Sequence, residues 1–178
     1  MTVLSAQSIH NRVGVNPGLI EPEKVILIEP YLSAAKQFKG MSYGLTAAGY
    51  DIRLGKIRHP DRDNVIVESC WLLPGKFLLA ASLERLAIPN DLQVIVHDKS
   101  SWARQGLALQ NTVLEPGWFG YITLELSNHG SKGLHLMTGM PIAQLIFHQL
   151  DEPTTIPYKG KYQDQDDTPN FAKEATDD

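Results

Sequence analysis

The sequence predicts a mainly β protein, a sandwich or barrel of many short strands that follow one short helix near the N-terminus. From residue 50 onward, apolar and polar residues alternate with a period of two. Pro, Gly and Asn turn signals separate the alternating runs at short intervals, as in all-β sandwiches and barrels. No helical pattern alternates with these runs, as the βαβ units of a parallel sheet would require.

A helix is predicted at the N-terminus because apolar residues recur there at near-helical spacing. These residues are Leu4, Ile9 and Val13. Ser5 suits the N-cap, and Gly14 is expected to end the helix. Residues 14–48 contain several prolines and glycines, so we expect loops and short extended pieces there.

The strands that follow are predicted from their alternation. Alternating runs begin at Tyr50, Leu92, Ile122 and Ile142, and a longer run places Phe77, Leu79, Ala81 and Leu83 on one face. The turn signals between the runs are Pro74-Gly75, Pro89-Asn90-Asp91, Glu115-Pro116-Gly117, His129-Gly130 and Thr138-Gly139. At 178 residues, the chain suits one domain.

The net charge of −4 is concentrated at the C-terminus. Residues 166–178 hold five carboxylates and one lysine, which accounts for the whole excess, so the rest of the chain is neutral. A protein that binds duplex nucleic acid needs a basic face, so we expect no nucleic-acid partner. We interpret residues 1–165 as a single domain and residues 166–178 as an acidic, flexible tail.

The composition also restricts the compartment. The lone cysteine, Cys70, excludes an internal disulfide and indicates a reducing compartment. No apolar run approaches the length of about 18 residues that a membrane helix needs, and the N-terminus lacks a signal-peptide pattern. We therefore expect a cytoplasmic protein without a membrane partner.

Several enzyme signatures are absent from the sequence. It contains no GxGxxG, GxxxxGK[ST] or GxSxG, which excludes the usual dinucleotide, P-loop and α/β-hydrolase motifs. A lone cysteine cannot form a paired CxxC zinc site, and the HxE and PCxxC pair of zinc base deaminases is missing. The six histidines form no short cluster, so we expect no zinc.

Three segments carry side chains of chemical interest. Lys99, Ser100, Ser101 and Arg104 follow the end of a predicted strand and can hold phosphate oxygens, although an ordinary turn explains them equally well. Glu125 lies mid-strand, either on a solvated face, which the pattern alone favours, or in a polar pocket. Residues 157–165 mix aromatics, lysines and amides. Such a segment can form a flap that closes over an anionic ligand, or it can be a coil without function.

These three segments, in this order, resemble the dCTP deaminase branch of the trimeric dUTPase superfamily. The matching stretches are Ser100-Ser101-Trp102-Ala103-Arg104, Ile122-Thr123-Leu124-Glu125, and Tyr158 with Lys161-Tyr162-Gln163-Asp164-Gln165. Residues 49–55 and 139–145 resemble the DxRLG and PGMxIxQL strands of the same family. The resemblance extends over about residues 47–165, and several motifs in register make it specific.

The resemblance implies a distorted, jelly-roll-like β-barrel (the dUTPase-like β-clip) and a homotrimer with active sites between subunits. It implies a hydrolase of cyclic amidine C–N bonds that converts dCTP to dUTP and ammonia, with Mg²⁺ carried by the nucleotide. Water is a weak nucleophile towards cytosine, so a metal-free deaminase needs a carboxylate that accepts the proton of the water. Glu125 corresponds to the catalytic glutamate of the family, and Ser100 and Arg104 to residues that position the water and polarise the site.

The resemblance also assigns substrate-binding positions. These are Lys99, Ser101, Glu115, Thr123, Leu124, Gln144, Tyr158, Lys161 and Gln165. Lys99 and Ser101 would contact phosphates, Glu115 would accept from the sugar 3′-hydroxyl, and residues 158–165 would fold over the triphosphate. A chain truncated after Gln165 is expected to keep its activity, whereas one truncated before Tyr158 is not.

The sequence departs from the family in the loop 108–114, which is shorter, and at Glu115, where the family has Asp. This loop frames the base in the family. A bifunctional enzyme that converts dCTP to dUMP, or a dUTPase, is an alternative function, because Ala48-Gly49-Tyr50-Asp51 and Leu109-Gln110-Asn111 resemble dUTPase sequence more than deaminase sequence. A nucleotide-binding protein without catalysis is a third alternative, because a fold does not determine a function.

Overall fold

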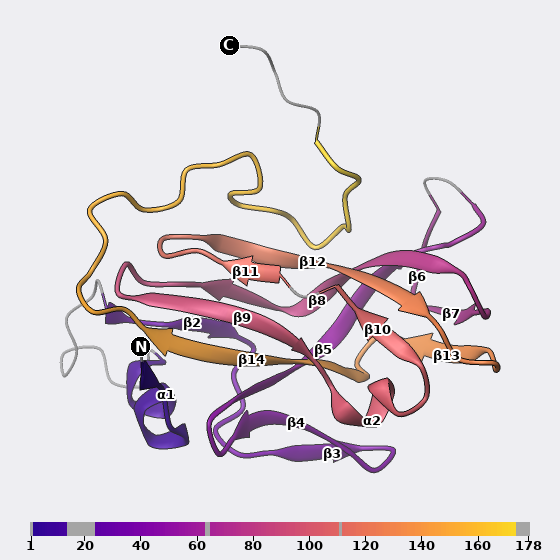
Figure 1. The fold of residues 1–178 in the computed structure, drawn as a ribbon, viewed down its shortest axis with the longest axis horizontal. Helices are drawn as coiled ribbons and strands as arrows, with labels where there is room; N and C mark the ends of the chain where they lie inside the picture. The colour runs from indigo at the N-terminus through magenta and orange to yellow at the C-terminus, as the bar shows by residue number, and fades with distance from the viewer. Residues whose placement is uncertain (1, 14–23, 63–64, 111, 174–178) are drawn as a thin grey trace.

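A computed structural model describes residues 2–13, 24–62, 65–110 and 112–173 (Figure 1). The elements are β1 Thr2–Val3, α1 Ala6–Arg12, β2 Leu27–Glu29, β3 Lys36–Phe38, β4 Met41–Thr46, β5 Gly49–Arg58, β6 Ile66–Val67, β7 Ser69–Leu72, β8 Phe77–Ala87, β9 Leu92–Asp98, α2 Ser100–Ala103, β10 Leu107–Leu109, β11 Thr112–Leu114, β12 Phe119–Asn128, β13 Leu134–Met137 and β14 Pro141–Gln149. The mainly β fold class predicted from the alternation is confirmed.

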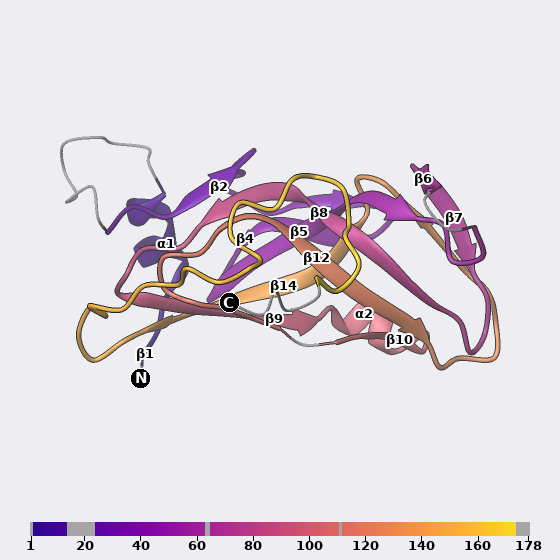
Figure 2. The same cartoon turned by 90° about the horizontal axis from the view of Figure 1, so that it is seen from above.

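Most of the strands belong to one antiparallel sheet. Its central path runs β10-β12-β8-β5-β14-β9-β11, and β7 and β13 form a separate pair. The sheet curls on itself as a half-barrel, which Figure 2 shows in the view from above. No helix within the described residues is long and apolar enough to cross a membrane.

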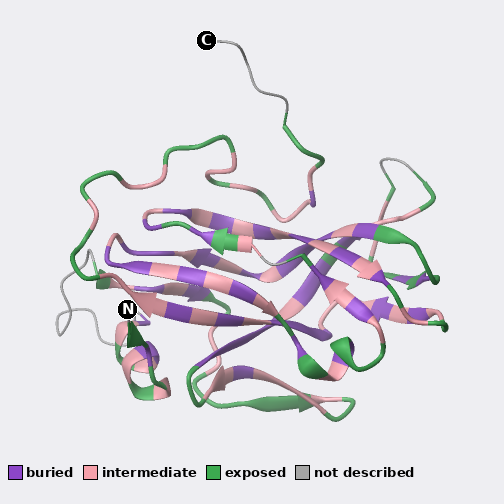
Figure 3. Ribbon diagram, in the orientation of Figure 1, coloured by how far each residue is buried: buried purple, intermediate pink, exposed green. Residues whose placement is uncertain are grey.

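The core lies inside the curl and consists of residues that the alternation predicts. The residues of β9 and β12 at Leu92, Val94, Leu124 and Leu126 are fully buried. In β8 the face that holds Phe77 and Leu79 is the more exposed one (Figure 3), because both residues border a cavity while Leu78, on the other face, packs into the core.

The N-terminal helix is confirmed. The Ser5 hydroxyl accepts a hydrogen bond from the backbone N–H of Ser8, and Ile9 is fully buried. Val13 is the C-cap, and the predicted stop at Gly14 lies outside the described residues. The Arg12 guanidinium forms an ion pair with Asp91, which ties the helix to the start of β9.

Candidate active site

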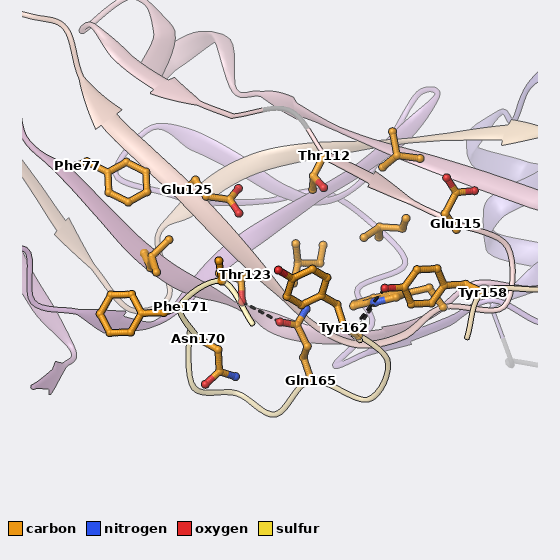
Figure 4. Close-up of a pocket in the computed structure, with 16 residues that line it drawn as sticks. Phe77, Thr112, Glu115, Thr123, Glu125, Tyr158, Tyr162, Gln165, Asn170 and Phe171 are labelled. Carbon is orange, nitrogen blue, oxygen red and sulfur yellow. Dashed lines mark hydrogen bonds between the residues drawn. The ribbon is translucent and has the colours of Figure 1, made fainter. Parts of the chain in front are cut away.

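A cavity of about 440 Å³ lies between β8, β11, β12 and the C-terminal segment (Figure 4). It is lined by five of the residues that the sequence places in the site: Glu115, Thr123, Glu125, Tyr158 and Gln165. Figure 4 shows Thr123 and Glu125 on β12, Glu115 in the turn before that strand, and Tyr158 and Gln165 on the C-terminal segment. The structure therefore brings these five residues together.

Glu125 lies on the wall of this cavity and is half-buried. Its neighbours Leu124 and Leu126 are fully buried on the other face of β12, so the strand turns the carboxylate towards the cavity (Figure 4). Burial raises the pKa of Glu125, because little solvent is left to stabilise the charged form; a hydrogen bond from its own backbone opposes this. A carboxyl group of this kind takes up a proton at a higher pH than an exposed one does.

An irregularity in the sheet lies beside the cavity. Tyr121 pairs with Arg85, but Thr123 pairs with Ala81, so β8 carries extra residues opposite Ile122. The Ser82 hydroxyl accepts a hydrogen bond from the Ile122 backbone N–H at 2.9 Å and donates one to the Glu84 carbonyl at 2.7 Å. These bonds satisfy backbone groups that the interrupted ladder leaves without a partner.

Glu84 is the buried charge at this irregularity. Its carboxylate accepts hydrogen bonds from the Arg53 side chain at 2.7 Å and from the Arg53 backbone N–H at 2.8 Å. Burial raises the pKa of Glu84, and the bonds from Arg53 oppose this. The sequence reasoning missed Glu84 and Ser82, although a glutamate inside the apolar run 77–87 was a usable signal.

The C-terminal segment lies along β12 and closes one side of the cavity. The Tyr158 N–H donates to the Pro116 carbonyl at 2.8 Å, and the Tyr121 N–H donates to the Gln165 carbonyl at 3.0 Å. The Thr123 hydroxyl donates to the Gln165 side chain at 3.2 Å, which Figure 4 draws as a dashed line. Gly120 has φ +134°, and a Cβ there would lie 2.7 Å from the Gln165 nitrogen, so the close approach depends on glycine.

The chain stays against the sheet after Gln165. Asp167 forms an ion pair with Lys56 at 2.8 Å, and the Arg58 guanidinium donates to the Pro169 carbonyl at 2.7 Å. The same guanidinium lies 4.4 Å from the centre of the Phe171 ring. Residues 170–172 line the cavity, so a part of the chain that the sequence assigns to a solvated tail belongs to its wall.

The other expected site residues lie elsewhere in the chain. Ser100 and Ser101 are in α2 and Arg104 is its C-cap, at the opposite side of the sheet from the C-terminal segment (Figure 1). Gln144 is on β14, opposite Asp51 in the pairing with β5. None of these residues lines the cavity described above.

Three expected substrate-binding side chains are held by contacts within the chain. The Lys99 ammonium is bonded to Asp51, and the Lys161 ammonium donates to the Lys173 carbonyl at 2.5 Å. The Leu124 side chain is fully buried in the core, which leaves only its backbone near the site. Within this chain, five predicted site residues line the cavity and Lys99, Ser100, Ser101 and Arg104 form a separate α2 group, while Leu124, Gln144 and Lys161 belong to neither group.

The comparison with known proteins identifies the family. A sequence profile described as dCTP deaminase-like matches residues 3–150. The chain is 37% identical over 160 residues to a dCTP deaminase of Campylobacter fetus, an alignment that covers 79% of this chain and 86% of the relative. This chain belongs to the dCTP deaminase family. A family member from Pseudomonas aeruginosa PAO1 is 32% identical over 185 residues, covering 93% of this chain and 96% of that one.

Solved structures agree with this family on the fold. The 2′-deoxycytidine 5′-triphosphate deaminase of Agrobacterium tumefaciens aligns with a TM-score of 0.59 at 17% identity, over 83% of this chain and 47% of that chain. A dUTPase of Staphylococcus bacteriophage 80alpha aligns with a TM-score of 0.52 at 14% identity, over 76% of this chain and 97% of that chain. The predicted dUTPase-like fold is confirmed.

Proposed function

We propose that this dCTP deaminase family member converts dCTP and water to dUTP and ammonia. The observation that carries the proposal is the place of Glu125, a half-buried carboxyl group with a raised pKa on the wall of a cavity of about 440 Å³. Water adds to C4 of cytosine while Glu125 accepts its proton. Glu125 returns that proton to N3 of the ring, and it then carries the proton of the new C4 hydroxyl to the amino group. The C4–N bond breaks as C4=O forms, and the amino group leaves as ammonia. The reaction is a hydrolysis of a cyclic amidine C–N bond.

The remaining cavity residues would bind the nucleotide. Glu115 would accept a hydrogen bond from the sugar 3′-hydroxyl, and the backbone at Thr123 and Leu124 would lie along the base. Tyr158 and Gln165 would cover the substrate, a role supported by their contacts with the turn before β12 and with β12 itself. Lys161 would exchange its bond to the Lys173 carbonyl for a phosphate oxygen.

The α2 group would complete the site from a neighbouring subunit. Ser100 and Arg104 would position the water and polarise the base, with Ser101 at the phosphates and Gln144 near the nucleotide. In this chain α2 lies apart from the C-terminal segment (Figure 1), and none of its residues lines the cavity, which supports this division. We therefore propose a homotrimer with shared active sites, acting in the cytoplasm.

Mg²⁺ would enter as part of the substrate, bound to the triphosphate. Within the described ranges, no three His, Cys, Asp or Glu side chains come together in a way that could hold a metal ion. Mg²⁺ commonly takes most of its ligands from phosphates and water, so this arrangement fits an ion brought by the nucleotide. Glu115 is the cavity carboxylate that remains for contact with the sugar or the hydrated ion.

The test is product analysis with purified protein. Incubation with dCTP and Mg²⁺ should yield equal amounts of dUTP and ammonia, measured by chromatography and by a coupled ammonia assay. Formation of dUMP and pyrophosphate would assign the bifunctional alternative instead, and dUTP as the only substrate would assign a dUTPase. Nucleotide binding by calorimetry without any turnover would contradict all three activities.

A further inference from the structure

The turn that carries Ser100 and Arg104 is attached to the sheet by side chains on three sides. The Asp98 carboxylate accepts a hydrogen bond from the Leu109 N–H at 2.7 Å, and the Trp102 indole donates to the Pro141 carbonyl at 2.7 Å. Lys99, the N-cap of α2, supplies the third attachment. A helix of this length has little stability of its own, so its position depends on these contacts.

The Lys99 side chain points into the protein and forms a charged cluster there. Its ammonium lies 2.6 Å from Asp51 Oδ2 on β5 and 3.3 Å from the Ser42 hydroxyl on β4. The Ser42 hydroxyl donates to the same Asp51 oxygen at 3.0 Å. Lys99 is 8% exposed and Asp51 is 2% exposed, so both charges are removed from solvent.

This burial makes the ammonium a poor candidate for binding a phosphate. If Lys99 turned outward, Asp51 would keep a buried negative charge without its cation, which is strongly unfavourable. The other carboxylate oxygen, Asp51 Oδ1, is also buried and has no hydrogen-bond partner among the described residues. The bond to Lys99 is therefore the main compensation for the Asp51 charge.

We infer that Lys99 is a positioning residue, which acts through Asp51 to hold α2 where Ser100 and Arg104 reach the substrate. The inference rests on the proposed deaminase function, and it replaces the phosphate contact that the family resemblance implies for Lys99. It also gives a role to Asp51, which the sequence reasoning did not place in the site. Small displacements of catalytic groups reduce the catalysed rate strongly, up to about 100-fold for a shift of about 1 Å.

Lys99→Met and Asp51→Asn distinguish positioning from phosphate binding, because the two roles predict opposite effects at Asp51. If Lys99 positions α2, both changes should lower kcat for dCTP by about 10- to 100-fold and leave the nucleotide Kd within about threefold. If Lys99 binds phosphate, Asp51 competes for its ammonium, so Asp51→Asn should tighten dCTP binding and leave kcat unchanged. That second result would overturn the inference.

The double variant Lys99→Met/Asp51→Asn separates positioning from stability. It contains no unpaired buried charge, so its melting temperature should recover relative to the single variants. Its kcat should stay low, because the link between α2 and β5 is still missing. A kcat that recovers together with the melting temperature would show a merely structural role and would overturn the inference. The double variant also serves if a single variant fails to fold.

Hydrogen exchange of residues 99–106, measured without nucleotide, tests the same link independently of activity. Protection should fall in all three variants and should be unchanged in Lys132→Met, a matched change at an exposed lysine. Unchanged protection in Lys99→Met would also overturn the inference. If the wild-type protein released no ammonia, the proposed function would fail, while this experiment would still report whether Lys99 holds α2.

Discussion

Replacing Glu125 with Gln tests the central chemical role in the site. The substitution keeps the size of the side chain and removes its ability to accept and return a proton. No hydrogen bond joins the Glu125 side chain to another residue of the described chain, and the amide oxygen of Gln can still accept the bond from the residue's own backbone, so the change should not weaken the fold. Loss of general acid–base catalysis typically costs about 10²- to 10⁴-fold in rate, or about 3–5 kcal/mol of transition-state stabilisation.

The same substitution has a predictable effect on stability. Burial raises the pKa of Glu125 in the folded protein, so between the unfolded and folded pKa values the folded state binds more protons than the unfolded state. The contribution of Glu125 to the free energy of unfolding therefore falls as the pH rises above about 4.3, the pKa of Glu in the unfolded chain. The loss is complete once the pH exceeds the higher pKa of Glu125 in the folded protein. Glu125→Gln removes this loss, so its melting temperature at pH 8 should equal or exceed that of the wild type.

The assays are ammonia release from dCTP at pH 7 and thermal unfolding at pH 4 and pH 8. Glu68→Gln, at an exposed position outside the cavity, is the matched control and should change neither measurement. Two results would refute the reasoning. One is a Glu125→Gln enzyme that keeps more than about a tenth of the wild-type rate. The other is a melting temperature at pH 8 that falls by several degrees.

The other predictions concern the support of the cavity. Glu84→Gln breaks a buried ion pair and should lower the free energy of unfolding by about 3–5 kcal/mol, measured by urea denaturation. Gly120→Ala should displace the C-terminal segment and raise the KM for dCTP roughly tenfold, which corresponds to about 1.4 kcal/mol. Gly139→Ala is the control for backbone strain, because Gly139 has φ +86° and no atom lies close to where its Cβ would be. This control should leave the KM unchanged. Truncation after Gln165 removes the contacts of residues 166–173, so it should lower the melting temperature by roughly 2–4 °C and raise the KM for dCTP. Truncation after Lys173 keeps those contacts and should change neither the melting temperature nor the KM. A Gln165 truncation that matches the full chain in both measurements would restore the expectation drawn from the sequence.

The alternation of side chains along the strands was sufficient to predict the fold class. Period-two patterns at Tyr50, Leu92 and Ile122 correspond to strands β5, β9 and β12, because one face of each strand packs in the core. In β8 the same alternation left undecided which face is the more buried. Phe77 and Leu79 look like core residues in the sequence, but they border the cavity beside Glu125.

The candidate site was predictable only as a set of residues. Motif order identified Glu125, Glu115 and Gln165, and the structure brings all three to one cavity. The direction of the Lys99 side chain was not predictable, because it depends on Asp51, which is 48 residues away along the chain. The family resemblance implied a phosphate ligand for Lys99, whereas the fold provides a buried carboxylate as its partner.

The sequence by itself determined the mainly β class and the family, and it predicted Glu125 as the carboxylate for the proposed chemistry. These follow from local alternation and from motifs whose residues are close together in the chain. The tertiary structure decided that Glu125 faces a cavity, that Lys99 is buried against Asp51 and that residues 170–172 line the cavity. The physical reason is that a strand pattern defines two faces, while the segments that cover each face come from distant parts of the chain.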